Sequence, residues 1–213
     1  MTRLRFQISM SLDGFIAGPN QSEQNPLGEG GEQLHEWAFK LAAWREPHGK
    51  PGGEVNESTG VVEASRENIG ATVMGRNMFG GRGRWEEKPW DGWWGEDPPF
   101  HMPVFVVTHH PRPPLAKHGG TTFTFVTDGI ESALEQVRLA AGGKDVALGG
   151  GANVAQQYLR AGLIDELQIN LVPVLLAGGK RLFDDLDGAD VRLEPLATVP
   201  ASDVTHLTYR VPR

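Results

Sequence analysis

Apolar residues recur along this chain with two different periods, and the period predicts which segments are strands and which are helices. Short apolar runs and strict alternation are typical of strands, whereas apolar residues three or four positions apart are typical of helices. The predicted strands are residues 4–10, 71–74, 104–107, 122–126, 146–148, 166–171, 191–196 and 204–211. The predicted helices are residues 33–44, 59–68, 128–141 and 152–161. Fully apolar strands that alternate with helices indicate an α/β domain whose central strands are covered on both faces.

Two of these elements carry signals that also predict which side chains are buried. Asp128 and Glu131 have the spacing of a capping box, the reciprocal hydrogen-bond pattern that starts a helix. The buried face of that helix is predicted to be Ile130, Ala133, Leu134 and Val137. In the strand at 166–171, the residues predicted to face the core are Leu167, Ile169 and Leu171, and those predicted to face outward are Glu166, Gln168 and Asn170.

Three apolar strands end in residues that suit a phosphate-bearing ligand. The second, third and fifth predicted strands are followed by Gly75-Arg76, by Thr108 and by the glycine run at 149–151, which begins a helix. Glycine lets the backbone approach a ligand closely, and the unpaired N–H groups of a helix N-terminus favour anions. Ligands of open α/β sheets bind at the carboxyl ends of the strands, so these ends together predict one extended ligand, most economically a dinucleotide. A tight turn without a ligand, and a surface salt bridge for Arg76, are the structural alternatives.

The first strand runs into Ser11-Leu12-Asp13-Gly14, and Asp13 is the candidate for acid–base chemistry. An early strand that ends in a glycine-rich loop often delivers site residues at its end. A carboxylate in that place can move a proton or orient a substrate. The Asp13-Gly14 pair is comparably typical of a simple turn or an N-cap, and proton donation by water is a further alternative.

A second unusual segment covers residues 80–99, which are rich in glycine and proline and contain Trp85, Trp90, Trp93 and Trp94. Aromatic residues gathered in an irregular loop form either a small satellite core or one wall of a pocket for a flat ligand. The segment is too long for a simple connection, so we expect a lid, an insertion or an interface element.

Composition narrows the class of protein further. The 213 residues are 39% hydrophobic with a formal net charge of −7, which predicts one globular domain over residues 1–213 and argues against a general nucleic-acid surface. The chain has no cysteine, which excludes disulfides, thiolate metal sites and cysteine nucleophiles and fits a cytoplasmic protein. No metal is predicted, and neither an 18-residue apolar span nor a secretory signal occurs, so no membrane partner is expected.

The order of these motifs resembles the dihydrofolate-reductase-like superfamily. The motifs in chain order are Ser11-Leu12-Asp13-Gly14-Phe15-Ile16-Ala17, Val73-Met74-Gly75-Arg76, Val106-Val107-Thr108 and Leu148-Gly149-Gly150-Gly151. Within the superfamily they are most similar to the reductase domain of the bifunctional riboflavin-biosynthesis deaminase-reductase. The resemblance covers nearly the whole chain except about 23–56 and 80–99. It implies a three-layer α/β fold with a mostly parallel central sheet, an antiparallel C-terminal edge and helices on both faces.

The resemblance also implies an NADPH-dependent reductase that delivers a hydride to a nitrogen heterocycle or a sugar imine. By their positions in the motifs, the residues that would hold the pyrophosphate are Gly149, Gly150, Gly151, Ala152, Asn153 and Val154. Those that would flank the cofactor from the other side are Gly75, Arg76, Asn77 and Met78, with Arg76 near the phosphates. Thr108 and His109 would lie by the adenosine ribose, and Ile16 and Ala17 by the nicotinamide carboxamide.

Departures from the family pattern leave the substrate open. The Trp-x-x-Pro pattern of dihydrofolate reductases is absent, and Phe79-Gly80-Gly81-Arg82 stands where the riboflavin-pathway enzyme has Asp-Asp-Pro-x-Leu. We therefore expect a stand-alone reductase of the riboflavin-pathway type, without the zinc deaminase domain, that acts on a small heterocycle. A dihydrofolate or pterin reductase, or a non-catalytic nucleotide-binding protein, is the alternative. The resemblance also implies a homodimer, for which residues 166–171 and 172–176 could supply the interface or equally a core.

Overall fold

The computed structural model describes residues 2–81 and 83–212. The two terminal residues lie outside the described part, and so does Arg82, the last residue of the segment that differs from the family pattern. The chain has two compact units. Unit 1 contains the residues up to Phe6 together with Asn68–Ile164, and unit 2 contains Gln7–Glu67 and the residues from Asp165 onward. Strand β1 (Leu4–Ser11) contributes its first residues to unit 1 and the others to unit 2. The chain predicted as one domain thus has two centres of packing.

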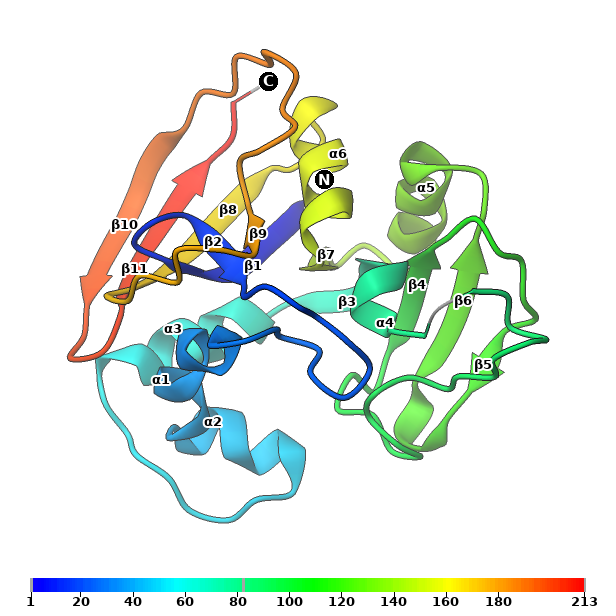
Figure 1. Cartoon of the computed structure of the whole chain (residues 1–213), viewed down its shortest axis with the longest axis horizontal. Coiled ribbons are helices and arrows are strands. Elements are labelled where there is room, and N and C mark those ends of the chain that lie inside the picture. Colours follow the sequence, from blue (N-terminus) through cyan, green and yellow to red (C-terminus); the bar gives the residue numbers. More distant parts are fainter. Residues whose placement is uncertain (1, 82, 213) are drawn as a thin grey trace. The chain divides into compact units, whose positions relative to one another are not determined.

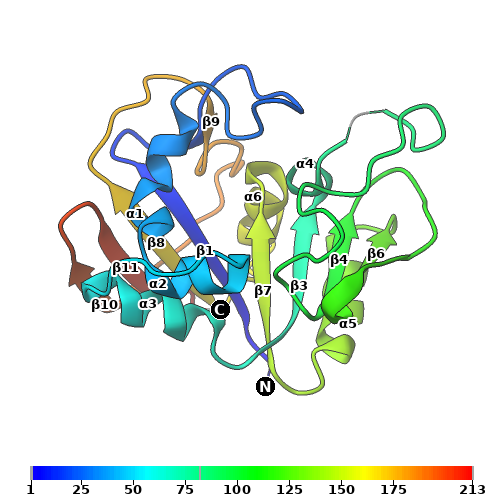
Figure 2. The same cartoon turned by 90° about the horizontal axis from the view of Figure 1, so that it is seen from below.

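Unit 1 is built on parallel strands (Figures 1 and 2). They are β7 (Asp145–Gly150), β3 (Ile69–Gly75), β4 (Pro103–Val107) and β6 (Thr122–Val126), and the first residues of β1 lie beside β7. Each of these strands pairs in parallel with the strand beside it. The short β5 (Leu115–Ala116) runs antiparallel to β6. Val73, Val104 and Leu148 are buried, as continuous apolar runs predict for strands covered on both faces.

The two longer helices of unit 1 follow the strands as predicted, with one correction at a helix start, whereas its two short helical segments were not predicted. They are α4 (Arg76–Phe79), the 3-10 turn η3 (His118–Gly120), α5 (Ile130–Ala140) and α6 (Ala152–Arg160). The four residues predicted to be the buried face of α5 are buried, and α5 packs on β3 and β4. The predicted capping box is wrong, because Gly129 takes the N-cap position and no side chain of the described residues caps it. Asp128 lies one residue too early, and its Oδ1 accepts a hydrogen bond from the Thr127 hydroxyl.

Helix α6 has the predicted bounds and the predicted buried face. Its buried residues include Val154, Ala155, Tyr158 and Leu159. Gly162, with φ of 62°, follows the helix where a left-handed residue is needed to end it. The Tyr158 hydroxyl donates a hydrogen bond to Ile130 O over 3.0 Å, so a buried contact joins α6 to the first turn of α5.

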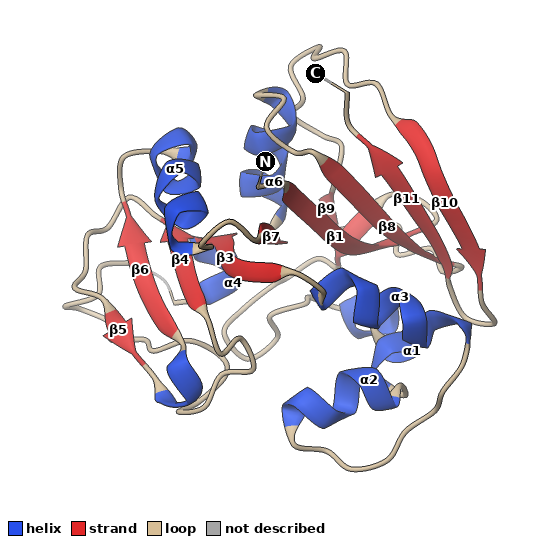
Figure 3. Ribbon diagram, turned by 180° about the vertical axis from the view of Figure 1, so that it is seen from behind, coloured by secondary structure: helices blue, strands red, loops and turns tan. Residues whose placement is uncertain are grey.

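Unit 2 is built on antiparallel strands (Figure 3). Strand β8 (Glu166–Val172) pairs with β11 (Thr205–Arg210), and β11 pairs with β10 (Glu194–Pro200), both antiparallel. The predicted antiparallel pair of C-terminal strands is therefore confirmed. A second, two-stranded sheet joins β2 (Phe15–Ala17) to β9 (Lys180–Arg181), two short strands that the sequence pattern does not predict.

The predicted alternation of β8 is confirmed for Leu167 and Ile169, which are buried, but it is wrong for the polar residues between and after them. Gln168 is 8% exposed and Asn170 is 2% exposed, whereas Leu171 is only half-buried. Asn170 Oδ1 accepts hydrogen bonds from Gln168 Nε2 at 3.0 Å and from His206 Nδ1 at 2.7 Å. Polar side chains that satisfy one another in this way can occupy core positions, which hydrophobic patterning alone does not predict.

The helix predicted over 33–44 is also wrong, because the chain breaks there. The segment forms η1 (Gly31–Leu34), α1 (Glu36–Phe39), α2 (Ala42–Arg45) and η2 (Glu46–His48), whereas the next predicted helix is present as α3 (Glu57–Arg66). Leu41 has ψ of 137°, an extended conformation, and forms a bridge with Glu54. Leu34, Trp37 and Leu41 are nevertheless buried in one apolar cluster with Val62 of α3. The periodicity therefore identified the buried residues but not the backbone.

The strand order of the large sheet is β10-β11-β8-β1-β7-β3-β4-β6-β5. Parallel pairing prevails from β1 to β6, and the strands that come last in the chain form an antiparallel edge. The predicted mixed α/β fold with a mostly parallel sheet and an antiparallel C-terminal edge is confirmed. No helix in the described part of the chain combines the length and the apolar character that crossing a membrane requires.

Candidate functional site

The three strand ends singled out in the sequence meet at one edge of unit 1. Strands β7, β3 and β4 are neighbours and run parallel, so their carboxyl ends point the same way. Met74 pairs with Gly150 and Gly75 with Val107, which places the glycine turn, the Gly75-Arg76 turn and Thr108 in sequence along this edge. The edge is where α/β sheets bind ligands.

Two close contacts join the glycine turn to the turn after β3. A Cβ on Gly75 would lie 3.1 Å from Val154 Cγ1, at the start of α6. A Cβ on Gly149 would lie 3.1 Å from the sulfur of Met78. Both glycines therefore allow a close approach that a larger residue would disturb. Within unit 1 the structure brings together residues 75–78 and 149–154, which were predicted to flank one cofactor.

The glycine turn leaves room in front of the N-terminus of α6. Gly150 has φ of 106°, a conformation that L side chains rarely adopt, and the Gly150–Gly151 peptide bond is cis. Gly151 is the N-cap residue of α6, and within the described residues no side chain caps this helix. Apart from its two neighbours in the chain, none of the described residues comes within 4 Å of the position that a Cβ on Gly151 would take. An open space in front of unpaired first-turn N–H groups suits an anionic group.

Arg76 lies in the first turn of α4 and forms no ion pair with any of the described residues, so the alternative of a surface salt bridge is not seen there. Its Nε and Nη2 donate to Gly80 O at 3.1 Å and to Gly83 O at 3.2 Å. The guanidinium carbon lies 3.3 Å from the centroid of the Trp85 ring, a cation–π contact. Burial, and then the charge of Arg112, lower the pKa of Arg76 from its ordinary value. Its Nη1 is buried and has no hydrogen-bond partner in the described part of the chain.

Thr108 and His109 follow β4 at the same edge. Thr108 is 5% exposed, and its Oγ1 accepts a hydrogen bond from His110 N–H at 3.2 Å. The hydroxyl thus shapes the turn after β4 while its own proton remains available as a donor. His109 is exposed. Because Gly75 pairs with Val107, the backbone at Thr108 and His109 continues beside the Gly75-Arg76 turn, and the two residues differ strongly in exposure.

The tryptophan-rich segment forms a satellite core around the end of β3. Trp85 is 7% exposed and belongs to an apolar cluster with Phe79 and Phe123, against which Trp90 and Trp94 pack. This agrees with the first of the two sequence interpretations. The sequence identified the aromatic residues but gave no signal of the backbone groups that their indole N–H groups contact.

Asp13 lies in unit 2, in the turn after β1, and its carboxylate is fully engaged. Its Oδ1 accepts from the Ser11 hydroxyl at 2.6 Å and from Leu176 N–H at 3.1 Å, and its Oδ2 accepts from Ala177 N–H at 2.8 Å. The hydrogen bond from Ser11 is the largest influence, and with the backbone N–H groups it lowers the pKa of Asp13 against the opposing effect of burial. A carboxylate held in its ionised form suits a structural clamp between two chain segments better than proton donation.

Ile16 and Ala17 are buried in unit 2, at 7% and 6% exposure, in the short strand β2. Ala17 pairs with Lys180 of β9. A Cβ on Gly179 would lie 2.0 Å from Ala17 O, so the chain before β9 crosses β2 in direct backbone contact. Because both side chains are buried, the segment contacts its surroundings here mainly through its backbone. Ile16 and Ala17 belong to a different unit from the three strand ends.

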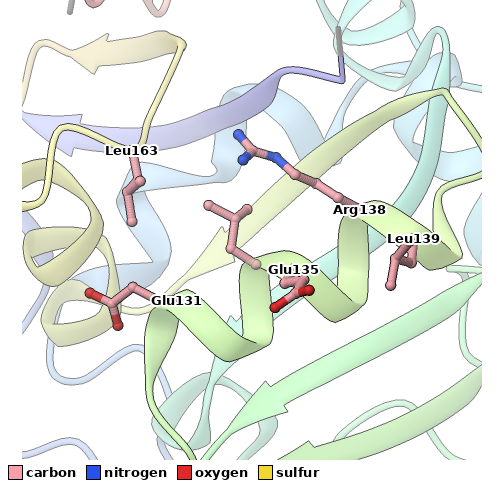
Figure 4. A pocket seen from close by; sticks show the side chains of 6 residues that line it. Glu131, Glu135, Arg138, Leu139 and Leu163 are labelled. Carbon is pink, nitrogen blue, oxygen red and sulfur yellow. The ribbon is translucent and has the colours of Figure 1, made fainter.

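A groove of about 420 Å³ lies along α5 in unit 1 (Figure 4). Its lining residues are Glu131, Leu134, Glu135, Arg138, Leu139 and Leu163. None of them is a predicted site residue, so this groove is not the strand-end site. Among residues 2–81 and 83–212, no group of three or more His, Asp or Glu side chains is arranged to hold a metal ion.

The mostly parallel sheet with its antiparallel C-terminal edge defines an α/β protein with the dihydrofolate-reductase-like fold. The chain belongs to the RibD C-terminal domain family, whose model matches residues 2–207. It is 36% identical over 188 residues to YyaP of Bacillus subtilis strain 168, a protein of uncharacterized function, with 86% of this chain and 81% of the relative aligned.

Solved structures agree on the fold. A protein from Shewanella sp. PV-4 assigned to riboflavin biosynthesis superposes with a TM-score of 0.64 at 22% identity over 100% of both chains. Dihydrofolate reductase from Enterococcus faecalis, solved with NADP(H), superposes with a TM-score of 0.51 at 15% identity over 99% of this chain and 97% of that chain. The family and its structural neighbours are reductases, which supports an oxidoreductase.

Proposed function

We propose that this protein is an NADPH-dependent reductase of the riboflavin-pathway type, similar to 5-amino-6-(5-phosphoribosylamino)uracil reductase and acting on a small nitrogen heterocycle. The observation that carries the proposal is the open glycine turn at the N-terminus of α6, which faces the Gly75–Met78 turn in unit 1. Family membership supports the reductase class. The buried Nη1 of Arg76 supports an anionic ligand at this place.

The residues present fit the cofactor at several points. Backbone N–H groups at 151–154 hold the pyrophosphate, because they face open space at a helix N-terminus. Arg76 binds a phosphate through its unpaired Nη1. Thr108 and His109 lie along the adenosine ribose, and the backbone of Ile16 and Ala17 contacts the nicotinamide carboxamide. The bound cofactor supplies the hydride, and this chain supplies orientation and electrostatics.

In this proposal Asp13 is the residue that orients the substrate, and water donates the proton that the substrate takes up. Its carboxylate already accepts three hydrogen bonds that favour the ionised form. The proposal includes a cytoplasmic homodimer. Leu175, 70% exposed in the loop after β8, supports an interface there, whereas Val172 is buried in the core of unit 2.

Cofactor binding is tested first by thermal stability. A ligand that binds the folded state at a hundred times its dissociation constant stabilises it by about 2.7 kcal/mol, which for a chain of this size raises the melting temperature by roughly 5–10 °C. We expect a shift of this size with NADPH and a smaller one with NADH, together with quenching of tryptophan fluorescence. The absence of any response to either cofactor at millimolar concentration would refute the proposal.

Two variants of Gly151 test where the pyrophosphate of the cofactor lies. Its φ of −81° suits any residue, and a Cβ there meets open space, so Gly151→Ala should fold and retain NADPH binding. Gly151→Asp adds a negative charge where the pyrophosphate is proposed to lie, and NADPH should then no longer shift the melting temperature. Equal NADPH affinity of the two variants would contradict this placement.

A further inference from the structure

Helix α4 depends on two tryptophans for the hydrogen bonds at its carboxyl end. Trp93 Nε1 donates to Met78 O and Trp90 Nε1 donates to Phe79 O, each over 2.9 Å. The helix has four residues, Arg76–Phe79, and a single helical turn is not stable without outside partners. The last carbonyl groups of any helix lack hydrogen-bond donors within the helix. Here two indole N–H groups are the donors.

The two glycines that follow α4 make room for these indoles. A Cβ on Gly80 would lie 2.5 Å from Trp93 Cε2, and a Cβ on Gly81 would lie 2.9 Å from Trp90 Cβ. The two rings also pack on one another, with centroids 4.6 Å apart at 72°. The sequence Gly80-Gly81, which replaces the expected family segment, therefore has a steric reason in this chain.

A third tryptophan makes the same kind of contact at the neighbouring strand end. Trp85 Nε1 donates to His110 O at 2.9 Å, and His110 N–H in turn donates to Thr108 Oγ1. The ring of Trp85 also stacks on the guanidinium of Arg76. Three indole N–H groups of one segment thus donate to backbone carbonyl groups just after β3 and β4.

The helical turn that Trp90 and Trp93 hold also approaches the glycine turn, through the side chain of Met78. Met78 contributes the sulfur that would lie 3.1 Å from a Cβ on Gly149, and Arg76 occupies the first position of the same helical turn. We propose that Trp90 and Trp93 are positioning residues, which fix α4 and thereby hold Arg76 and Met78 in place for the cofactor. This inference rests on the proposed function, because it concerns the same cofactor site.

The segment 83–99 is accordingly a fixed support for the cofactor site rather than a lid. A lid that opens in each catalytic cycle would have to break the hydrogen bonds that Trp90 and Trp93 donate to α4 and the packing of Trp94 on Phe123. Loss of the support should weaken cofactor binding and leave the hydride-transfer step nearly unchanged.

The test replaces single tryptophans by phenylalanine, which keeps an aromatic ring and removes the N–H donor. Trp90→Phe, Trp93→Phe and the double variant are compared with Trp94→Phe as a matched control. Trp94 is half-buried like the other two and stacks on Phe123 with centroids 6.0 Å apart, and its indole N–H makes no hydrogen bond to the described residues. The readouts are the dissociation constant and KM for NADPH, kcat and the melting temperature, all in the full chain.

Loss of one neutral hydrogen bond predicts a rise of about threefold to tenfold in the dissociation constant and KM for NADPH in each single variant, and a larger rise in the double variant. Trp94→Phe should keep NADPH affinity within about twofold even where it lowers the melting temperature equally, and kcat should stay within about twofold throughout. Equal loss of affinity in the control and in the test variants, or no loss in the latter, overturns the positioning role alone. If the wild-type chain does not bind NADPH, the proposed function fails, and this role fails with it.

Discussion

Single residues at the candidate site either make room or hold the chain. Gly151 faces open space at the start of α6, and Gly75 allows β3 to approach that helix. Asp13 does the opposite in unit 2, where its carboxylate joins the turn after β1 to the backbone of Leu176 and Ala177. The sequence predicts Asp13 as a candidate for acid–base chemistry or for a turn, but it could not predict the contacts with Leu176 and Ala177, because these residues lie more than 160 positions further along the chain.

The clamp leads to a prediction for Asp13→Asn. The amide N–H₂ group would face the Ala177 N–H, so the variant should have a lower melting temperature. Its kcat should fall by less than about tenfold, and the pH profile of kcat should keep its shape, whereas loss of a general acid costs about a hundredfold or more. Ser11→Ala removes one of the three hydrogen bonds to Asp13 and also the acceptor of the Phe15 N–H, so it should lower the melting temperature as well. Disappearance of one limb of the pH profile in Asp13→Asn would instead show that Asp13 transfers a proton.

At the scale of elements, a buried polar network joins α3 to the antiparallel strands of unit 2. His206 of β11 is 1% exposed, and its Nδ1 donates to Asn170 Oδ1, since an amide oxygen can only accept. Its Nε2 then accepts from the Ser58 hydroxyl of α3 at 2.9 Å. Both ring nitrogens are satisfied in the neutral form, and burial lowers the pKa of His206 to about 4.

This network predicts how stability depends on pH. Unfolded histidine titrates near pH 6.5, so above that pH the contribution of His206 is complete, and it is lost as the pH falls from about 6.5 to 4. The free energy of unfolding should drop by about 2–3 kcal/mol over this range on account of His206. Burial lowers the pKa of His35 to about 4 as well, so it should add a second, similar drop.

Denaturant unfolding at several pH values separates the two histidines. His206→Gln should be less stable than the wild type at pH 7 and should lose about half of the decline below pH 6.5, because His35 remains. His118→Asn, a change at an exposed position, should keep the wild-type decline. A full decline in His206→Gln would show that His206 is not the group responsible.

Elements defined by apolar runs could be predicted well, and those defined by polar partners could not. Strand β6 and helix α6 follow from periodicity, because apolar side chains decide their conformation. The failure over 33–44 came from Leu41, whose extended backbone is set by pairing with Glu54. The failure at Gln168 and Asn170 came from hydrogen bonds across strands, which leave no periodic signal in the sequence.

At the scale of the whole molecule, chain order and sheet topology together explain why the site motifs are far apart in sequence. The turns after β3, β4 and β7 lie more than 30 residues apart in the chain, yet parallel pairing of neighbours brings them to one edge of unit 1. Motif order could therefore predict this half of the site. The tryptophan contacts could not be predicted, because a carbonyl acceptor has no side-chain signature.

A crystal structure of the protein with bound NADPH tests the central claim most directly. The proposal predicts the pyrophosphate within hydrogen-bond distance of the backbone N–H groups at 151–154, and a phosphate oxygen on Arg76 Nη1. NADPH bound elsewhere, or crystals that stay free of NADPH at saturating concentration, would contradict the assignment of this site and with it the proposed function.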